Sequence, residues 1–299
     1  MRLILLIGES GQIGHALHHA LSALGQVVAV GRDRMDLTRP DTIRSTLQSV
    51  TPDVIVNAAA YTAVDQAETD VDLAKRINGT APGILAEEAV RQGALLVHYS
   101  TDYVFDGTKR RPYTETDRPN PINAYGKTKL DGEQAIRRVG GPHLILRTSW
   151  VYSQRRTNFL RSMLRLGRER DWLQVVDDQT GSPTWAPWIA GATTRILEQT
   201  LERSRQGPSE ELYHLSSQGA ATWCEFAQAI FETFGVNTVT VEPIPSSAYP
   251  IEASRPAYSV LSNQKVKTDF SLEIPTWKEQ LRMARQSGAP AEDGIGRQH

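Results

Sequence analysis

Two side chains that stand four residues apart, Tyr125 and Lys129, could together move a proton to or from a substrate oxygen. The motif that carries them, YGKTK, is expected to be helical, and residues four apart share one face of a helix. A free tyrosine has a pKa of about 10, and a neighbouring ammonium lowers that pKa because it favours the phenolate. Reduction of a carbonyl needs such a proton donor when hydride reaches the carbon. A surface Tyr–Lys pair can show the same spacing by chance, so the neighbouring motifs decide between the two.

A threonine hydroxyl is expected close to this pair. Thr101 follows the apolar run Leu95–Tyr99, which is typical of a buried strand, and Asp102 comes next. A hydroxyl at the end of a strand, facing the tyrosine hydroxyl, would place a carbonyl oxygen between two hydrogen-bond donors. These residues predict a reductase in which Thr101, Tyr125 and Lys129 are catalytic.

A glycine-rich turn near the N-terminus predicts nucleotide binding. The segment GESGQIG, residues 8–14, follows one expected strand and opens an expected helix. Glycines let the backbone turn sharply there and approach a pyrophosphate, which lies on the helix N-terminus. The residues expected to contact a dinucleotide are Gly8, Ser10, Gly11, Gln12, Ile13 and Gly14. A glycine-rich turn without a ligand is the alternative interpretation.

The end of the second expected strand bears on which dinucleotide binds. NAD-selective sites usually place an acid there, for the ribose 2′-hydroxyl. This chain has Gly31 and Arg32, with Arg34 nearby, and a guanidinium suits a 2′-phosphate. The interpretation favours NADPH, with NADH as the alternative, unless both arginines are simply solvated. Residues 57–62, with the sequence NAAAYT, follow the third strand, and their small side chains would let the cofactor lie close to the backbone.

Short apolar runs alternate with amphipathic stretches in the first half of the chain. This alternation predicts an α/β fold, a doubly wound, Rossmann-like parallel sheet with helices on both faces. The expected strands are Leu3–Ile7, Val27–Val30, Val54–Val56, Leu95–Tyr99 and Leu144–Leu146, and the expected helices are Gln12–Leu24, Pro40–Val50 and about Asp70–Gln92.

The second half is less regular and predicts a smaller α/β region that binds the substrate. Its expected helices are Asn158–Arg170, Trp188–Glu202 and Trp223–Phe234, its expected strands are Leu173–Val176, Leu212–Leu215 and Val239–Val241, and loops are expected at 204–211 and around Pro243–Pro256. We assign residues 1–150 to dinucleotide binding, rejoined by about 178–210, and residues 151–177 and 211–286 to the substrate. Residues 287–299 are expected to be a disordered tail.

Composition excludes several classes of protein. The 299 residues are 39% hydrophobic and 22% charged with a formal net charge of -1, so they give no basic footprint for nucleic acid. The lone Cys224 cannot form an internal disulfide, which favours a cytoplasmic setting. No apolar stretch approaches the ~18 residues of a membrane span.

Two further kinds of site are not expected. No acidic partner in a metal-site pattern accompanies His15, His18 and His19, so a metal site is not expected. No GxSxG motif occurs, so a serine hydrolase is not expected either.

Longer motifs at the same positions resemble those of a known family. They are GESGQIG, PDVIVNAAAYTAVDQAE, HYSTDYVFDG, NPINAYGKTKLDGE, LRTSWVY, DDQTGSPT and SAYPIEASRP, spread over nearly all of residues 1–284. The chain resembles the extended short-chain dehydrogenase/reductases and, among them, the dTDP-4-dehydrorhamnose reductases. The resemblance implies NAD(P)H-dependent reduction of the C4 ketone of dTDP-4-dehydro-β-L-rhamnose, a step in dTDP-L-rhamnose biosynthesis.

The resemblance also implies roles for individual residues. The catalytic set is matched by Thr101, Tyr125 and Lys129. Positions near the dinucleotide are matched by Ser10, Gly11, Gln12, Asp36, Leu37, Ala60, Tyr61, Thr62 and Tyr99, besides Tyr125 and Lys129. Positions on the substrate side are matched by Thr101, Asp102, Tyr125, Trp150, Gln179 and Arg255. The Arg255 guanidinium would suit a diphosphate, although it could instead pair with a carboxylate, and Trp150 could be plain core.

At two places the sequence departs from the family, and these departures limit which family properties can be expected of this chain. Gly31 and Arg32 replace the acid that some members have at the end of the second strand, which argues against a preference for NADH. His15, Ala16 and Pro187 stand where some members hold magnesium between two subunits, so no metal is expected and a homodimer is an open expectation. Two other functions stay open. One is a reductase that makes a different dTDP-6-deoxyhexose, and the other is a non-catalytic dinucleotide-binding subunit resembling the regulatory subunit of methionine adenosyltransferase.

Overall fold

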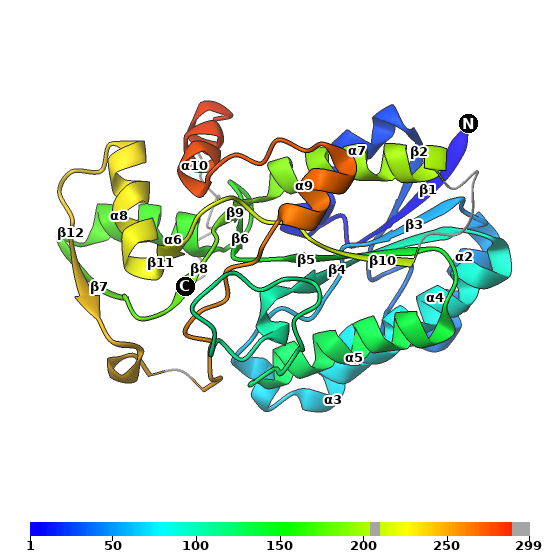
Figure 1. The fold of residues 1–299 in the computed structure, drawn as a ribbon, viewed down its shortest axis with the longest axis horizontal. Coiled ribbons are helices and arrows are strands. Elements are labelled where there is room, and N and C mark those ends of the chain that lie inside the picture. The colour runs from blue at the N-terminus through cyan, green and yellow to red at the C-terminus, as the bar shows by residue number, and fades with distance from the viewer. Residues whose placement is uncertain (204–209, 251, 289–299) are drawn as a thin grey trace, which may run out of the picture.

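A single parallel sheet organises the larger part of the molecule (Figure 1). The computed structural model describes residues 1–203, 210–250 and 252–288. The strands of the sheet lie in the order β10-β5-β4-β3-β1-β2, and every neighbouring pair is parallel. They are β1 (Arg2–Ile7), β2 (Gly25–Val30), β3 (Val54–Asn57), β4 (Leu95–Thr101), β5 (His143–Thr148) and β10 (Glu210–His214). The α/β class with a parallel central sheet, predicted from the sequence, is confirmed.

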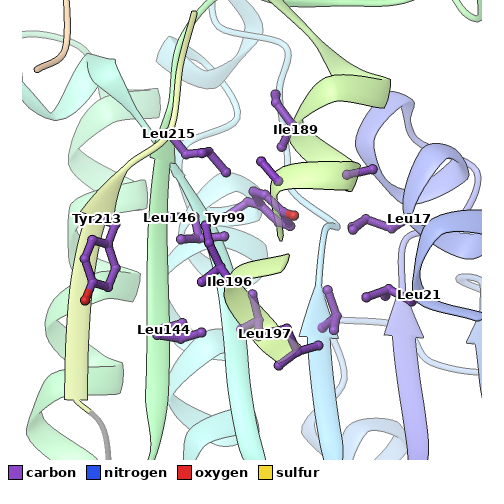
Figure 2. Packing of buried hydrophobic residues seen from close by; sticks show 14 of the residues in the cluster. Leu17, Leu21, Tyr99, Leu144, Leu146, Ile189, Ile196, Leu197, Tyr213 and Leu215 are labelled. Carbon is purple, nitrogen blue, oxygen red and sulfur yellow. The ribbon is translucent and has the colours of Figure 1, made fainter. Parts of the chain in front are cut away.

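Helices cover both faces of this sheet. One face packs against α1 (Gln12–Ala20), α7 (Ala186–Arg203) and α9 (Gln264–Phe270), and the other against α2 (Pro40–Val50), α4 (Ala81–Gln92) and α5 (Ala124–Val139). Strands β3, β4 and β5 are buried at every residue, which explains their largely apolar sequences. Figure 2 shows one side of this core, where Ile189, Ile196 and Leu197 of α7 lie near Leu144 and Leu146 of β5.

The order of the strands marks the edge at which ligands are expected. From β1 the chain proceeds to β2 on one side, and it then crosses to β3 on the other side of β1, so the order of the strands reverses at β1. In open parallel sheets ligands bind at such a point, outside the carboxyl ends of the strands. Gly8 follows β1 at this edge, residues 58–62 follow β3, and Thr101 ends β4.

The long helix predicted at about Asp70–Gln92 is divided in the structure. The chain passes from α3 (Val71–Ala74) through a π-helical turn, η3 (Lys75–Thr80), into α4. Pro82, in the first turn of α4, has no N–H for the carbonyl of Asn78 four residues earlier, so the regular hydrogen-bond ladder cannot continue. The Asn78 side chain binds the backbone N–H and C=O of Tyr61 at 2.9 and 3.0 Å. The turn that the sequence did not predict therefore holds the segment after β3 in place.

The smaller region is built around the parallel pair β7 (Trp172–Val176) and β12 (Thr240–Ile244). Apolar side chains join this pair to α6 (Phe159–Glu169), α8 (Trp223–Phe234) and α10 (Trp277–Gln286). Short pairs complete it, β6 (Val151–Tyr152) with β9 (Thr184–Trp185) and β8 (Thr180–Gly181) with β11 (Ala221–Thr222). The proline-rich loop after β12 contains one 3₁₀ turn, η6 (Ser246–Ala248). Both α8 and α10 begin with a capping box, which satisfies backbone N–H groups of their first turns.

One predicted strand belongs to a different part of the molecule from the one expected. The sequence predicts the strand at Leu212–Leu215 in the smaller region, but β10 pairs with β5 at the edge of the main sheet. Buried β5 needs a neighbour for its N–H and C=O groups, and β10 supplies it. Glu210 and Glu211 also lie in this strand rather than in the predicted loop, while residues 204–209 of that loop lie outside the described part of the chain.

The tail predicted at 287–299 lies, from residue 289 on, outside the described residues. Within residues 1–203, 210–250 and 252–288, no helix is long and apolar enough to cross a membrane.

Candidate active site

The predicted catalytic residues meet where β4 ends and α5 begins. Asn123 caps α5, and its side-chain oxygen accepts the N–H of Gly126 at 2.7 Å. A Cβ at Gly126 would lie 2.1 Å from the carbonyl oxygen of Tyr103, so only glycine lets α5 come this close to the segment after β4. That approach brings Tyr125 within hydrogen-bonding reach of Thr101, with Lys129 one turn further along α5.

Tyr125 presents a half-buried phenol next to the Thr101 hydroxyl. Burial raises the pKa of Tyr125 to about 12, while hydrogen bonding to Thr101 opposes this rise and the charge of Asp102 adds to it. The Tyr103 ring meets the Tyr125 ring edge-on, with 5.9 Å between their centroids. The phenol therefore keeps its proton throughout the neutral range, as a proton donor must, and a positive charge nearby would help it release that proton.

Lys129 is enclosed between α5 and β4, with only 2% of the residue exposed. Its Nζ donates to the carbonyl oxygen of Tyr99 at 2.5 Å and lies 3.2 Å from Nε2 of His98. Burial lowers the pKa of Lys129 to about 8, while the Glu133 carboxylate, one turn further along α5, acts in the opposite direction. Neither His98 nor Glu133 was predicted as a site residue, because each is a single polar residue with no motif spacing of its own.

Asp102 lies behind Thr101 and does not present its carboxylate to solvent. The residue is 2% exposed, and its oxygens accept hydrogen bonds from the hydroxyls of Thr101 at 3.1 Å, Ser149 at 2.9 Å and Ser259 at 2.6 Å. Burial raises the pKa of Asp102 to about 6, although the three hydroxyls counteract this. Three hydroxyls thus hold the carboxylate in the interior, and its place near the substrate stays a prediction. Its two serine partners were not predicted.

The glycine-rich turn has the shape that a bound dinucleotide requires. Gly8 has a φ of 86°, and a Cβ there would lie 2.7 Å from the backbone nitrogen of Ala59. A Cβ at Gly14 would lie 2.0 Å from the carbonyl oxygen of Gly8, so both positions need glycine. No side chain caps α1, which begins at Gln12, so its first N–H groups are available to a pyrophosphate. The residues present therefore fit a dinucleotide.

The other residues predicted near the dinucleotide differ in exposure and in the chemical groups of their side chains. The Arg32 side chain is 78% exposed and lies 3.6 Å from the Asp36 carboxylate, so its guanidinium is accessible to a 2′-phosphate. The backbone N–H and hydroxyl of Thr38 hold the pKa of Asp36 below its usual value. Leu37 packs into the core against the sheet. Ser10 and Thr62 are exposed, and Ile13, Ala60 and Tyr61 are half-buried.

Gln12 and Tyr99 turn their side chains away from this edge. The Gln12 oxygen accepts hydrogen bonds from Ser153 and Asn158, each at 2.9 Å, and so ties α1 to the segment after β6. The Tyr99 ring lies in the core beside α7, with its hydroxyl 2.6 Å from that of Thr193 (Figure 2). The role of both residues near the dinucleotide stays a prediction, and with these side-chain contacts in place it would fall to their backbone groups.

Trp150 is held in a strained backbone conformation by its neighbours. It has a φ of 44°, and its ring stacks on Trp223 with 3.5 Å between centroids and 2° between planes. A Cβ at Gly181 would lie 2.3 Å from the Trp150 ring. A bulky residue keeps such a backbone only where its surroundings fix it, and such residues cluster at functional sites. Gln179, also predicted on the substrate side, is buried just before β8, and Trp223 was not predicted because it looks like an ordinary residue of an amphipathic helix.

Arg255 is engaged by a carboxylate, the alternative that the sequence left open. Its Nη1 and Nη2 donate to the two oxygens of Asp65 at 3.0 and 2.7 Å. The backbone N–H of Ala253 donates to the same carboxylate at 3.1 Å. This two-pronged contact attaches the loop after β12 to the segment after β3. Asp65 was not predicted, because only the fold brings it to Arg255.

Three histidines lie close together on α1. The rings of His15 and His19 lie 5.4 Å apart, and those of His18 and His19 lie 5.8 Å apart, between centroids. Over the part of the chain that the structure describes, no three His, Cys, Asp or Glu side chains are grouped so as to hold a metal ion.

Comparison with known proteins agrees with this geometry. The family described as RmlD substrate binding domain matches residues 1–288. A dTDP-4-dehydrorhamnose reductase of Burkholderia thailandensis is 49% identical over 283 residues, covering 92% of this chain and 95% of that protein. The enzyme of the same name from Salmonella typhimurium is 42% identical over 284 residues, covering 92% and 94%. The crystal structure of the Bacillus anthracis dTDP-4-dehydrorhamnose reductase in complex with NADP has a TM-score of 0.88 at 33% identity, covering 96% of this chain and 99% of that one. The chain described here belongs to the family of dTDP-4-dehydrorhamnose reductases.

Proposed function

We propose that the protein uses NADPH to reduce the C4 ketone of dTDP-4-dehydro-β-L-rhamnose, giving dTDP-β-L-rhamnose for dTDP-L-rhamnose biosynthesis. The junction of β4 and α5, where Thr101, Tyr125 and Lys129 lie together, carries the proposal. The glycine-rich turn after β1 fits a dinucleotide at the same edge of the sheet. The names of the Burkholderia thailandensis and Bacillus anthracis reductases, the latter with NADP bound, support this substrate and cofactor.

The side chains of the site act on the oxygen of the ketone. NADPH, when bound, supplies the hydride that reaches C4. Tyr125 donates its phenolic proton to the oxygen, and burial keeps that proton in place until negative charge develops there. In the substrate-free protein the Thr101 hydroxyl donates to Asp102 behind it. With substrate bound, the same hydroxyl turns its proton to the ketone oxygen, while Ser149 and Ser259 still donate to the Asp102 carboxylate. A positive charge on Lys129 lowers the free energy of the phenolate that Tyr125 becomes.

Exchange of Tyr125 for phenylalanine tests the assignment of the proton donor. Tyr125→Phe should lower kcat by about 10²–10⁴-fold, which is the usual contribution of a general acid to the rate, and it should leave the Kd for NADPH nearly unchanged. The measurement is NADPH consumption with the dTDP-linked 4-keto sugar as substrate. Tyr249→Phe, which removes the same hydroxyl from an exposed tyrosine, is the matched control and should turn over like the wild type. Near-normal turnover of Tyr125→Phe would contradict the proposal.

Arg32 is expected to select the phosphorylated cofactor. A charge-assisted hydrogen bond contributes about 1.5–3 kcal/mol, so Arg32→Ala should raise the KM for NADPH by about 10–100-fold. The KM for NADH should stay the same, because NADH lacks the 2′-phosphate. Arg39→Ala, at an exposed arginine that pairs with Asp41, is the control and should change neither constant. An unchanged KM for NADPH in Arg32→Ala would argue against this role.

The remaining parts of the proposal have their own tests. Identification of the C4 stereochemistry of the product distinguishes this enzyme from a reductase that makes a different dTDP-6-deoxyhexose. A regulatory subunit would instead bind a partner and oxidise no NADPH, and the complete set of Thr101, Tyr125 and Lys129 favours the enzyme.

We place the reaction in the cytoplasm, in keeping with the free, buried Cys224, and fractionation of cells would test this. A homodimer stays an open expectation, since His15, Ala16 and Pro187 depart from the family where some members join two subunits, and the mass in solution would test it.

A further inference from the structure

Three buried polar side chains from different elements form one hydrogen-bonded line that ends at Lys129. Asn57 ends β3, His98 lies opposite it in register on β4, and Lys129 comes from α5. Each of the three residues is at most 2% exposed. Nδ2 of Asn57 lies 3.1 Å from Nδ1 of His98, and Nε2 of His98 lies 3.2 Å from Nζ of Lys129. The reaction proposed above assigns no part to Asn57 or His98.

The backbone decides which way the Asn57 amide points. Its oxygen accepts the N–H of Ala59 at 3.2 Å, so its NH₂ group is the one that faces His98. Turning the amide round would set two N–H groups against each other at Ala59. Nδ1 of His98 therefore accepts the hydrogen bond from Asn57. Burial holds the pKa of His98 well below its usual value, so the ring is neutral and carries its one proton on Nε2.

The Nε2–H group of His98 is directed at the Lys129 amine. An ammonium has N–H groups but no lone pair, so it would meet this N–H donor against donor. An uncharged amine accepts the hydrogen bond from His98 and still donates to the carbonyl of Tyr99. Both contacts of Lys129 are satisfied together only when the amine is uncharged.

The charged groups around Lys129 do not reverse this preference. Glu133 raises the pKa of Lys129, but burial lowers it by more, and Arg147 of β5 binds the Glu133 carboxylate at 2.9 and 2.6 Å. Ser100 of β4 donates to the same carboxylate at 2.5 Å. Asp102, at the start of the turn after β4, is engaged by three hydroxyls, and η3 contributes the neutral Asn78. A hydrogen bond that forms only to the uncharged amine lowers the pKa of Lys129 further.

We propose that Asn57 and His98 are positioning residues that keep Lys129 uncharged in the cofactor-free protein, so that Lys129 takes up a proton as NADPH binds. The ribose hydroxyls of a dinucleotide can accept hydrogen bonds from an ammonium, which the Nε2–H of His98 cannot. The positive charge that helps Tyr125 release its proton is then present only when the source of hydride is present. The uptake of a proton on NADPH binding rests on the proposed function, whereas the placement of the proton on His98 does not.

The first experiment locates the proton on His98 in the cofactor-free protein. Protonated and bare ring nitrogens differ in ¹⁵N NMR, and the His98→Gln variant identifies the His98 signals among those of the 7 histidines. We expect a protonated Nε2 and a bare Nδ1 in the wild type. In Asn57→Asp, which keeps the shape of the side chain, the carboxylate accepts from both Ala59 and His98, and the proton should move to Nδ1. A wild-type His98 with its proton on Nδ1 overturns the inference, whether or not the variant folds.

The second experiment counts the protons taken up when NADPH binds. Titration calorimetry in buffers of different ionisation enthalpy gives this number, and at about pH 8 the 2′-phosphate, with a second pKa of about 6, contributes none. We expect an uptake of at least about half a proton in the wild type. Asn57→Asp should take up almost none, because Nε2 of His98 then accepts from an ammonium that is already present. Equal uptake by both proteins overturns the inference and leaves the proposed function intact. Failure of the wild type to bind NADPH overturns the proposed function, and the inference with it.

Discussion

The carboxylate of Asp102 reaches the predicted catalytic set in two ways: its charge raises the pKa of Tyr125, and it binds the hydroxyl of Thr101. Its partners come from three segments, since Thr101 ends β4, Ser149 follows β5 and Ser259 lies in the loop after β12. The Thr101 hydroxyl donates to Asp102, so its oxygen is left to face Tyr125. The charge of Asp102 thus sets the direction of a hydrogen bond in the catalytic set.

This arrangement predicts an acid limit to the activity. Burial raises the pKa of Asp102 to about 6, so the carboxylate is charged above that pH and accepts from all three hydroxyls. Below about pH 6 it is protonated and becomes a donor itself, so one hydroxyl loses its acceptor. We expect the kcat of the wild type to fall about tenfold for each pH unit on the acid side, where the active form is the minor one. The measurement is kcat as a function of pH.

Asp102→Asn separates Asp102 from other groups that titrate. An asparagine is neutral at every pH and presents an NH₂ group to partners that are themselves donors, so kcat should be lower by about tenfold or more and show no inflection near pH 6. Asp41→Asn, at an exposed aspartate, should leave the pH profile unchanged. An inflection at the same pH in Asp102→Asn would mean that another group causes it.

Sequence reasoning at this scale predicts site residues from side-chain types that can transfer or hold a proton. Thr101, Tyr125 and Lys129 stand out because a hydroxyl, a phenol and an amine follow a strand and share a helix face. His98 and Ser259 do not stand out. His98 lies inside an apolar strand, and only the register of β3 and β4 sets it against Asn57. Ser259 is 157 positions from Asp102 along the chain, and only the fold brings them together.

At the scale of elements, periodicity predicts most strands and helices of the sheet, but it predicts neither α9 and α10 nor the points where the chain departs from regularity. Buried strands such as β3 and β5 are short apolar runs, so they were recognised. The π-helical turn η3 was missed because Pro82 looks like a residue inside a longer helix, although it cannot donate to the carbonyl of Asn78. The place of β10 was missed because apolar spacing identifies a strand without naming its neighbour.

The turn between β1 and α1 yields a prediction about one glycine. In Gly14→Ala the new Cβ would lie 2.0 Å from the carbonyl oxygen of Gly8, and backbone atoms cannot yield as a flexible side chain can. We expect a loss of about 1–3 kcal/mol in the free energy of unfolding, from overpacking, and a loss of NADPH binding. Urea unfolding and calorimetric titration with NADPH measure the two effects.

A second glycine supplies the control for this prediction. Gly191 lies inside α7, and a Cβ there would have no atom within 4 Å. Gly191→Ala should therefore stabilise the protein by up to about 1 kcal/mol, the difference in helix propensity, and bind NADPH like the wild type. If Gly14→Ala behaved in the same way, the close packing of the turn would not be required for the site.

At the scale of the whole molecule, the loop formed by residues 253–259 fastens the smaller region to the edge of the sheet. Arg255 and Ala253 bind Asp65, in the segment after β3. The carbonyl of Ser254 accepts a hydrogen bond at 2.8 Å from Asn123, the residue that caps α5. Ser259 donates to Asp102, as described above. Three contacts with three different parts of the site make the position of this loop a part of the catalytic geometry.

The pair of Arg255 and Asp65 therefore has a consequence for substrate binding. A lysine carries a single point of charge and cannot reproduce the two-pronged contact, so Arg255→Lys should loosen the loop. We expect the KM for the sugar nucleotide to rise about tenfold, as for the loss of one charge-assisted hydrogen bond, while the Kd for NADPH stays the same. Arg165→Lys, on the exposed pair with Glu169 in α6, should leave both constants unchanged.

Asp65→Asn decides how Arg255 acts. If Arg255 acts by holding the loop to Asp65, the amide weakens the same contact and the KM for the sugar nucleotide rises as in Arg255→Lys. The double variant should then be no worse than either single variant, because both substitutions break one interaction. If Arg255 instead binds the diphosphate of the substrate directly, as the family resemblance implies, Asp65 competes for it, and Asp65→Asn should lower the KM. We expect the first result, because both Nη groups of Arg255 are engaged by Asp65 and hold a loop that also reaches Asn123 and Asp102.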